Sequence, residues 1–136
     1  MDTRVKPVAA SVDYLLHLAD NAVVLGQRNA EWRGHAPILE EDLAMANQAL
    51  DLFGQARLLY QLAATRLNAQ GRTSRPSAWP AGPITEDTLA YFRADRDFLN
   101  YTLHELPHHA GLVPASGGER DWAITIVRNF FYATLM

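Results

Sequence analysis

The order of apolar and polar residues predicts a long amphipathic helix over residues 12–31. Leu15, Leu18, Ala22 and Leu25 fall on one broad face at helical spacing. The polar residues gather on the opposite face: His17, Asp20, Asn21, Gln27, Arg28 and Glu31. We expect that face to meet solvent, with His17 solvated rather than acting as a ligand.

A second and more apolar helix is predicted over residues 39–68, after a turn that Gly34 and Pro37 impose on residues 33–37. Three acidic residues in its first turn suit the helix dipole. Two apolar stripes follow different faces, one being Leu39, Leu43, Ala46, Leu50, Phe53, Arg57 and Tyr60, the other Met45, Ala49, Leu52, Ala56, Leu59 and Ala63. With apolar stripes on nearly all sides, this helix is predicted to be buried between several neighbours.

The remaining chain alternates loops with shorter helical patterns. Residues 70–84 and 107–118 are rich in Gly and Pro and are predicted to be loops. Residues 85–105 begin with a helix-start signal at Thr85 and form one helical segment or two short ones. Residues 121–136 begin another apolar helix without a stop signal, so the chain is expected to end while a helix is still running. No strand pattern competes, and the fold class is therefore all-α: a single domain over residues 1–136, built as an antiparallel helical bundle that is incomplete at its C-terminus.

Composition narrows the function. Of 136 residues, 49% are hydrophobic and the net charge is -3, which is typical of a globular protein without a nucleic-acid-binding field. There is no cysteine, which excludes disulfides and thiolate chemistry. No apolar run is long enough to span a membrane, and the first residues do not resemble a signal peptide, so a cytoplasmic location is the default expectation.

The run His104-Glu-Leu-Pro-His108 matches the His-Glu-x-x-His signature of zinc proteases. That signature works on a helix, where both histidines share a face, and Pro107 breaks a helix at this point. We therefore interpret the motif as a coincidence: a helix that ends near Glu105, followed by a histidine-bearing loop that includes His108 and His109.

One polar seam runs along the second helix, formed by Asn47, Gln48, Asp51 and Gln55. The seam is either the thin solvent strip of a buried helix or an inward-facing polar site that needs hydrogen-bond partners. Asp51 is the residue that distinguishes these interpretations.

Glu31 and His35 lie four residues apart at the end of the first helix. One carboxylate and one imidazole are too few ligands for a transition metal, so capping or hydrogen bonding is the expected role.

Several segments together resemble the structural, C-type subunit family of bacterial ring-1,2-phenylacetyl-CoA epoxidases. They are residues 14–28, 31–37, 39–57, 87–100 and 123–128. The resemblance runs almost continuously from Tyr14 to Met136 and covers about the first half of a family member. It implies a ferritin-like bundle without a working metal site, paired with the homologous di-iron catalytic (A-type) subunit of the epoxidase. The whole complex, which also has a reductase and a small subunit, uses oxygen and NADPH to epoxidise the ring of phenylacetyl-CoA in phenylacetate catabolism.

The residues can be compared with that implication directly. A di-iron carboxylate bundle uses a Glu from each of two helices and a Glu-x-x-His pair from each of the other two. On the second helix the corresponding stretch is Asp51-Leu-Phe-Gly54, and glycine offers no ligand. We therefore expect no catalytic residue, no cofactor-binding residue and no metal ligand in this chain.

The leading hypothesis is thus a structural subunit that holds a catalytic partner, with self-association of the chain as a further expectation. Two alternatives stay open. The chain is a metal-bearing oxygenase subunit in its own right, or it is a helical self-associating protein without a link to phenylacetate.

Overall fold

The computed structural model describes residues 11–71, 79–106 and 122–135. These residues form helices and connections without any strand. The helices are α1 (Val12–Glu31), α2 (Leu39–Ala69), α3 (Glu86–Tyr91), α4 (Thr102–Glu105) and α5 (Trp122–Leu135), with a single 3₁₀ turn at Asp95–Asp97. The all-α prediction is confirmed, and the first two helices begin where the sequence pattern predicts. Residues 85–105 hold short pieces rather than one continuous helix.

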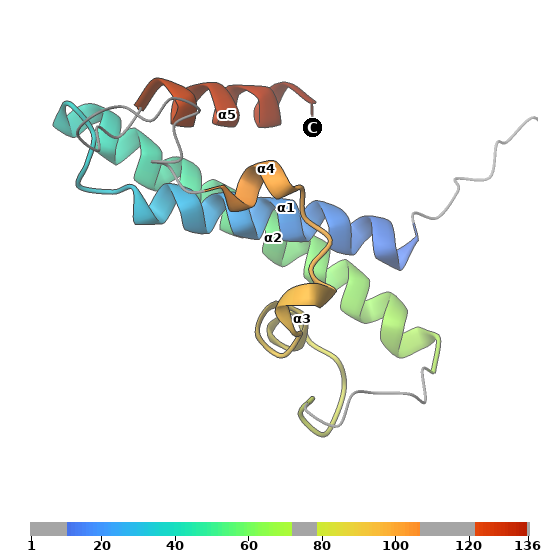
Figure 1. Cartoon of the computed structure of the whole chain (residues 1–136). Helices are drawn as coiled ribbons and strands as arrows, with labels where there is room; N and C mark the ends of the chain where they lie inside the picture. Colours follow the sequence, from blue (N-terminus) through green and yellow to red (C-terminus); the bar gives the residue numbers. More distant parts are fainter. Residues whose placement is uncertain (1–10, 72–78, 107–121, 136) are drawn as a thin grey trace, which may run out of the picture.

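The two long helices form an antiparallel hairpin (Figure 1). The Oγ of Ser11 accepts a hydrogen bond from the Tyr14 amide at 3.2 Å and caps α1. Helix α2 starts without a side-chain cap, but Glu40, Glu41 and Asp42 occupy its first turn. The two helices approach closely at Gly26, where an added Cβ would lie 3.1 Å from the Phe53 ring.

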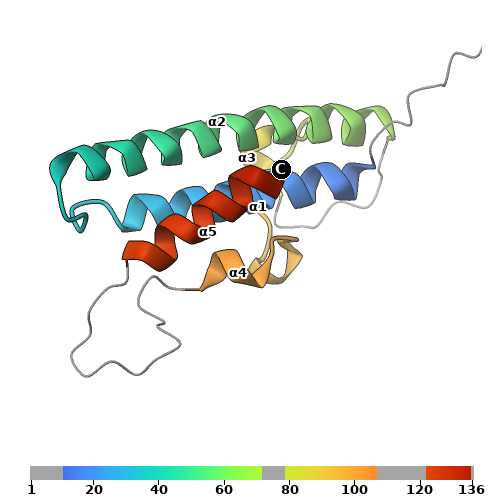
Figure 2. The same cartoon turned by 90° about the horizontal axis from the view of Figure 1, so that it is seen from above.

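Helix α5 lies over α1 and runs in the same direction as α2 (Figures 1 and 2). Two helices of a bundle that run the same way need a long crossover between them, and residues 70–121 supply it. A hairpin followed by one long crossover is the connectivity of ferritin-like folds. The ferritin-like, all-helical prediction therefore agrees with the path of the chain.

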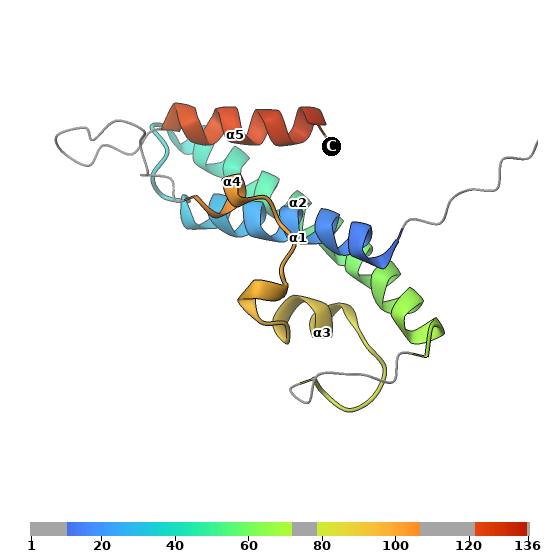
Figure 3. The same cartoon turned by 45° about the vertical axis from the view of Figure 1, so that its right-hand side comes forward.

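The described part of the crossover folds onto α1 and the C-terminal half of α2. Thr85 and Thr88 form a capping box that starts α3, as the sequence signal at Thr85 predicts. The side chain of Asn68 fixes the approach, since its amide donates to the Ile84 carbonyl at 2.8 Å and accepts from the Ile84 amide at 2.9 Å. Helix α3 thus lies on one side of α2, and α4 lies between α1 and α5 (Figure 3).

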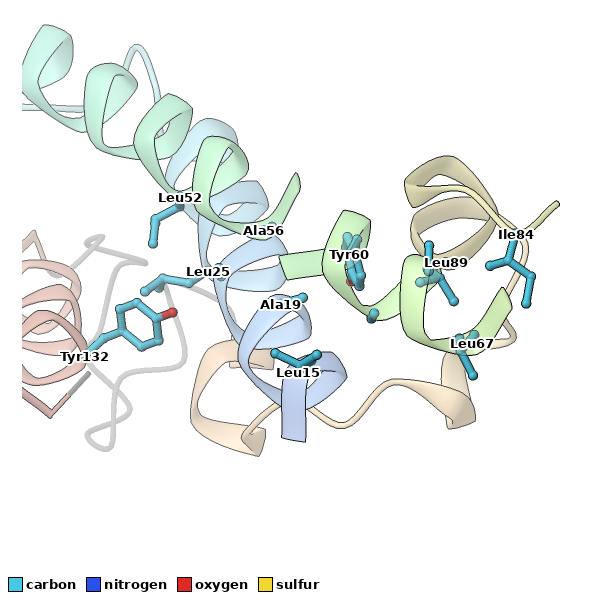
Figure 4. Packing of buried hydrophobic residues seen from close by; sticks show 13 residues of the cluster. Leu15, Ala19, Leu25, Leu52, Ala56, Tyr60, Leu67, Ile84, Leu89 and Tyr132 are labelled. Carbon is cyan, nitrogen blue, oxygen red and sulfur yellow. The ribbon is translucent and has the colours of Figure 1, made fainter. Parts of the chain in front are cut away.

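The hydrophobic core runs along the α1–α2 contact and continues to α3 and α5 (Figure 4). Small residues such as Ala19, Ala22 and Ala56 are fully buried and let the helices approach, while Leu25 and Leu89 fill the larger spaces. None of the described helices combines the length and hydropathy that a membrane-spanning helix requires.

The core differs from the sequence prediction in two respects. Asp20 and Asn21 are completely buried instead of facing solvent, because the crossover covers that face of α1. Helix α2 is buried on one side only, and five of its leucines are exposed: Leu39, Leu43, Leu50, Leu58 and Leu62. Among the described residues, neighbours therefore cover α2 on one side and not on nearly all sides as predicted.

Candidate functional site

The polar seam on α2 faces solvent. Asn47, Asp51 and Gln55 are exposed and Gln48 is half-buried. Gly54 is also exposed, and nothing lies within 4 Å of the position that its Cβ would occupy. Of the two interpretations of this seam, the structure supports the solvent strip.

Glu31 and His35 are exposed and bind different partners. Glu31 accepts a hydrogen bond from the Arg28 guanidinium at 2.8 Å. The Nδ1 of His35 lies 3.2 Å from the carbonyl oxygen of Trp32, and its ring lies against the Trp32 indole. Both side chains thus complete the end of α1, which is the hydrogen-bonding role predicted for them.

The first histidine of the HELPH run is part of the protein interior. His104 belongs to α4 and is buried, with its ring edge-on to Tyr132 at a centroid distance of 5.1 Å. His104 thus lies in the helix that was predicted to end near Glu105, and its burial is a feature that the sequence analysis did not predict. Helix α4 ends at Glu105, as Pro107 predicts, and Pro107, His108 and His109 lie outside the described residues.

Two arginines hold the carbonyl groups at the end of α4. Arg28 of α1 donates to the Glu105 carbonyl at 2.6 Å, and Arg128 of α5 donates to the Leu106 carbonyl at 2.7 Å. These carbonyls would lack helical partners because the helix stops here. The end of α4 is therefore fastened to both neighbouring helices.

The largest polar cluster surrounds Asp20 of α1. Its Oδ1 accepts hydrogen bonds from the Tyr60 hydroxyl at 2.6 Å and from the Arg93 guanidinium, and its Oδ2 accepts from Arg93 at 3.1 Å and from the Leu99 amide at 2.8 Å. The Asp20 side chain is 0% exposed and that of Arg93 is 5% exposed. The carboxylate is therefore surrounded by donors, and its charge is balanced by a buried guanidinium.

Arg93 is held as firmly as its partner. Its Nε donates to the Leu89 carbonyl at 2.6 Å, and its guanidinium lies over the Phe98 ring at 4.3 Å from the centroid. The pKa of the Tyr60 phenol is raised, mainly by burial and secondly by the hydrogen bond to Asp20. The phenol therefore keeps its proton and acts as a donor at any physiological pH. This cluster joins α1, α2 and the crossover.

A second polar group continues along α1. The Oδ1 of Asn21 accepts from the Tyr101 amide at 2.7 Å, and its Nδ2 donates to the His17 carbonyl at 2.9 Å. The Nδ1 of His17 forms a hydrogen bond with the Leu99 carbonyl, and the side chain is half-buried. The prediction that His17 is solvated is therefore wrong. These contacts fix the extended stretch between the 3₁₀ turn and α4.

Helices α1 and α5 meet at a buried pair of amides. Asn29 donates to the Asn129 side-chain oxygen at 2.7 Å, and Asn129 returns a bond to Asn29 at 3.0 Å. Nearby, the indole rings of Trp32 and Trp122 stack at a centroid distance of 6.3 Å. A reciprocal amide pair in an apolar contact fixes the register of two helices, because any sliding leaves both amides unsatisfied.

Replacing Asn29 by leucine should lower the free energy of unfolding by about 2 kcal/mol, because the side-chain oxygen of Asn129 then loses its hydrogen-bond donor in the interior. The double variant Asn29→Leu/Asn129→Leu should recover most of this loss. Urea unfolding of the two single variants and the double variant measures the coupling. Additive losses would show that the amides do not depend on each other.

These arrangements do not form a metal site in the part of the chain that the structure describes. No group of three or more His, Cys, Asp or Glu side chains is placed to hold an ion there. Asp20 is the one buried carboxylate among these residues, and a divalent cation would have to displace Arg93 to reach it. The described residues therefore do not fit a di-iron centre.

Hollows lie on the surface of the described residues, and two of them are large. The larger, about 500 Å³, lies between α1, α2 and α3 and is lined mainly by Phe53, Tyr91, Phe98 and the exposed ion pair of Arg57 with Glu86, whose atoms are 3.5 Å apart. The smaller, about 390 Å³, lies between α4 and α5 and is lined by His104, Tyr132 and neighbouring residues.

Comparison with known proteins now adds the family. The family model described as "Phenylacetic acid catabolic protein" matches residues 2–136. Over 118 residues the chain is 42% identical to the C-type subunit of the 1,2-phenylacetyl-CoA epoxidase of Escherichia coli (strain K12). That alignment covers 87% of this chain and 38% of the relative, so the chain spans well under half of the relative's length. The resemblance found in the sequence is confirmed, and the chain belongs to the family of phenylacetic acid catabolic proteins.

Proposed function

We propose that this chain acts in phenylacetate catabolism as a structural, non-catalytic part of a phenylacetyl-CoA epoxidase complex. The similarity to the C-type subunit of such an epoxidase supports the pathway and the complex. The single observation that carries the structural role is the Asp20 cluster, in which a guanidinium neutralises the buried carboxylate. A catalytic di-iron bundle would instead need buried carboxylates that are free to bind metal.

The role is then to present a rigid helical surface to a catalytic partner. Helix α5 exposes an apolar and aromatic side, which includes Ile126, Val127, Phe130 and Phe131. Aromatic residues are enriched at protein interfaces, and obligate interfaces are large and apolar. We propose this side of α5 as the contact with the homologous di-iron catalytic subunit, with the reductase and the small subunit of the epoxidase completing a cytoplasmic complex.

Affinity capture from phenylacetate-grown cells, followed by iron analysis, tests this function. The chain should retain the di-iron subunit, and iron should be found with the complex rather than with the isolated chain. Phe130→Glu should reduce capture at least tenfold, because it buries a charge in an apolar contact. The matched control is Leu50→Glu on α2, an equally drastic change on another face, which should leave capture unchanged.

Two outcomes would contradict the proposal. Stoichiometric iron on the isolated chain, lost in Asp20→Asn but kept in Asp51→Asn, would identify a metal-bearing subunit. Capture without any di-iron partner would favour a self-associating protein outside this pathway.

A further inference from the structure

The hollow between α4 and α5 has an open mouth and a buried floor. Three of its lining residues are about half exposed and form the mouth, namely Tyr101, Leu103 and Phe131. Three others are at least nine-tenths buried and form the floor, namely His104, Arg128 and Tyr132. The volume of about 390 Å³ is in the range of roughly 300–1,000 Å³ that small-molecule sites occupy.

The hollow lies away from the side on which a helical bundle of this kind continues. Figure 2 shows α2 and α4 on opposite sides of α5. In a bundle whose third long helix lies over α1, a fourth helix packs beside α2 and α5, on the side of Asp51 and Gly54. The hollow is on the other side, next to α4. Its floor is buried by the described residues alone, so any further chain can only increase that burial.

The floor offers hydrogen-bond donors and no carboxylate. The Nδ1 of His104 is buried and has no hydrogen-bond partner among the described residues, so it needs one from a ligand or an ordered water. Arg128 donates to the Leu106 carbonyl at 2.7 Å, which uses one of the five N–H groups of a guanidinium. None of the described residues that line the hollow is acidic. A negatively charged acceptor is therefore the best complement to this floor.

Positive charges around the floor also favour an anion. The pKa of Arg128 is lowered first by burial and then by the positive charge of Arg28. Burial and then the charge of Arg128 lower the pKa of His104 in the same way. Both groups thus lie in a site with an excess of positive charge, which a bound anion would offset.

The walls of the hollow favour a flat ring. The His104 ring is edge-on to Tyr132 and to Tyr101, with centroid distances of 5.1 and 5.9 Å, and Phe131 adds a further ring at the mouth. Tyr132 contributes its ring rather than its hydroxyl, which points toward Leu25 (Figure 4). An aromatic ligand can therefore make the offset and edge-to-face contacts that aromatic rings prefer.

We infer that the hollow between α4 and α5 binds a small aromatic carboxylate. The carboxylate accepts hydrogen bonds from Arg128 and from the Nδ1 of His104, and the ring lies among the aromatic side chains nearer the mouth. This inference goes beyond the proposed function, which gives the chain no ligand. Phe131 also belongs to the proposed contact with the di-iron subunit, so a bound ligand would lie next to that contact.

Titration of the purified chain, followed by nuclear magnetic resonance, tests the inference with three probes. Phenylacetate carries both the ring and the carboxylate, acetate carries the carboxylate alone and phenylacetamide carries the ring without the charge. Phenylacetate should shift the imidazole signals of His104 saturably, with a Kd at least about tenfold lower than that of either other probe. Equal binding of acetate would show an anion site without ring recognition, and equal binding of phenylacetamide would show an apolar cavity. Either result, or no saturable shift, would overturn the inference.

Two substitutions test the location of the carboxylate. Arg128→Gln keeps a donor for the Leu106 carbonyl and removes the charge, so it should raise the Kd about tenfold. The matched control is Arg57→Gln, which removes an exposed guanidinium from the larger hollow between α1, α2 and α3 and should leave the Kd unchanged. The opposite pattern would place the ligand in the larger hollow and overturn the assignment.

The wild-type spectra decide the location even if Arg128→Gln does not fold. Signals of His104 and Phe131 should shift on addition of phenylacetate, whereas those of Tyr91 and Phe98 in the larger hollow should not. The inference and the proposed function also fail separately. Binding is measured on the chain alone, so an absence of binding leaves the capture of a di-iron subunit untouched, and failed capture leaves the binding result standing.

Discussion

Replacing Asp20 by leucine should lower the free energy of unfolding by about 3–5 kcal/mol, because it leaves the Arg93 guanidinium buried without a counter-charge. Asp20 accepts four hydrogen bonds, from Tyr60, from Leu99 and twice from Arg93. A loss of this size is a large part of the stability of a small domain. The measurement is urea unfolding followed by circular dichroism. The milder Asp20→Asn variant keeps the shape, and it provides a folded sample if the leucine variant does not fold.

Two further variants show whether the charge pair causes the loss. The double variant Asp20→Leu/Arg93→Met should be clearly more stable than Asp20→Leu, because it removes both charges together. Asp95→Asn is a matched control in the same crossover, where the side chain is exposed, and it should change stability by less than about 0.5 kcal/mol. If the double variant is no better than the single one, the two residues are not coupled.

Amide hydrogen exchange shows which part of the structure a substitution of Asp20 destabilises. The Leu99 amide donates to Asp20 at 2.8 Å and the Tyr101 amide donates to Asn21 at 2.7 Å. In Asp20→Asn we expect fast exchange at Leu99, with Tyr101 less affected and the core amides around Leu25 still protected. Uniformly fast exchange would indicate global unfolding instead of release of the crossover.

Helical periodicity predicted the helices of this chain well and their surroundings less well. The spacing of Leu15, Leu18, Ala22 and Leu25 placed α1 correctly, and Thr85 and Pro107 marked a helix start and a helix stop. These signals are local: they depend on residues one or two turns apart. Which neighbour covers a given face is a non-local property, and periodicity does not contain it.

The two errors about burial have the same cause. Asp20 and Asn21 were assigned to the surface because they are polar, whereas the crossover brings Arg93 and the amides of Leu99 and Tyr101 onto them. Leu43 and Leu50 were assigned to the interior because they are apolar, yet no described residue covers them. Asp20 and Asn21 interrupt the otherwise apolar run of residues 18–26, and this was the one signal that could have suggested a buried cluster.

The buried imidazole of His104 should make the free energy of unfolding depend on pH. Burial, together with the positive charges of Arg128 and His17, lowers the pKa of its imidazole to about 4. Its Nδ1 has no hydrogen-bond partner among the described residues, and its ring lies between Tyr101 and Tyr132. The folded protein therefore holds this histidine neutral in a site that disfavours a proton.

The consequence for stability follows from linkage. In the unfolded chain a histidine titrates near its ordinary pKa of about 6.5, so between that pH and about 4 the unfolded state binds more protons than the folded state. The contribution of His104 to the free energy of unfolding is fully present above pH 6.5 and is lost as the pH falls toward 4. We expect that loss to reach about 3 kcal/mol, since one pKa unit corresponds to about 1.4 kcal/mol.

Replacing His104 by phenylalanine keeps an aromatic ring against Tyr132 and removes the titrating group. Urea unfolding of wild type and His104→Phe at a series of pH values between 7.5 and 4 gives the difference directly, because the carboxylates contribute equally to both proteins. As the pH falls, the free energy of unfolding of His104→Phe should rise steadily relative to that of the wild type. His35→Gln, which changes an exposed histidine at the end of α1, should follow the wild-type curve. Parallel curves for wild type and His104→Phe would mean that the imidazole titrates alike in the folded and unfolded chain, and the tight packing of α4 between α1 and α5 would then have to be wrong.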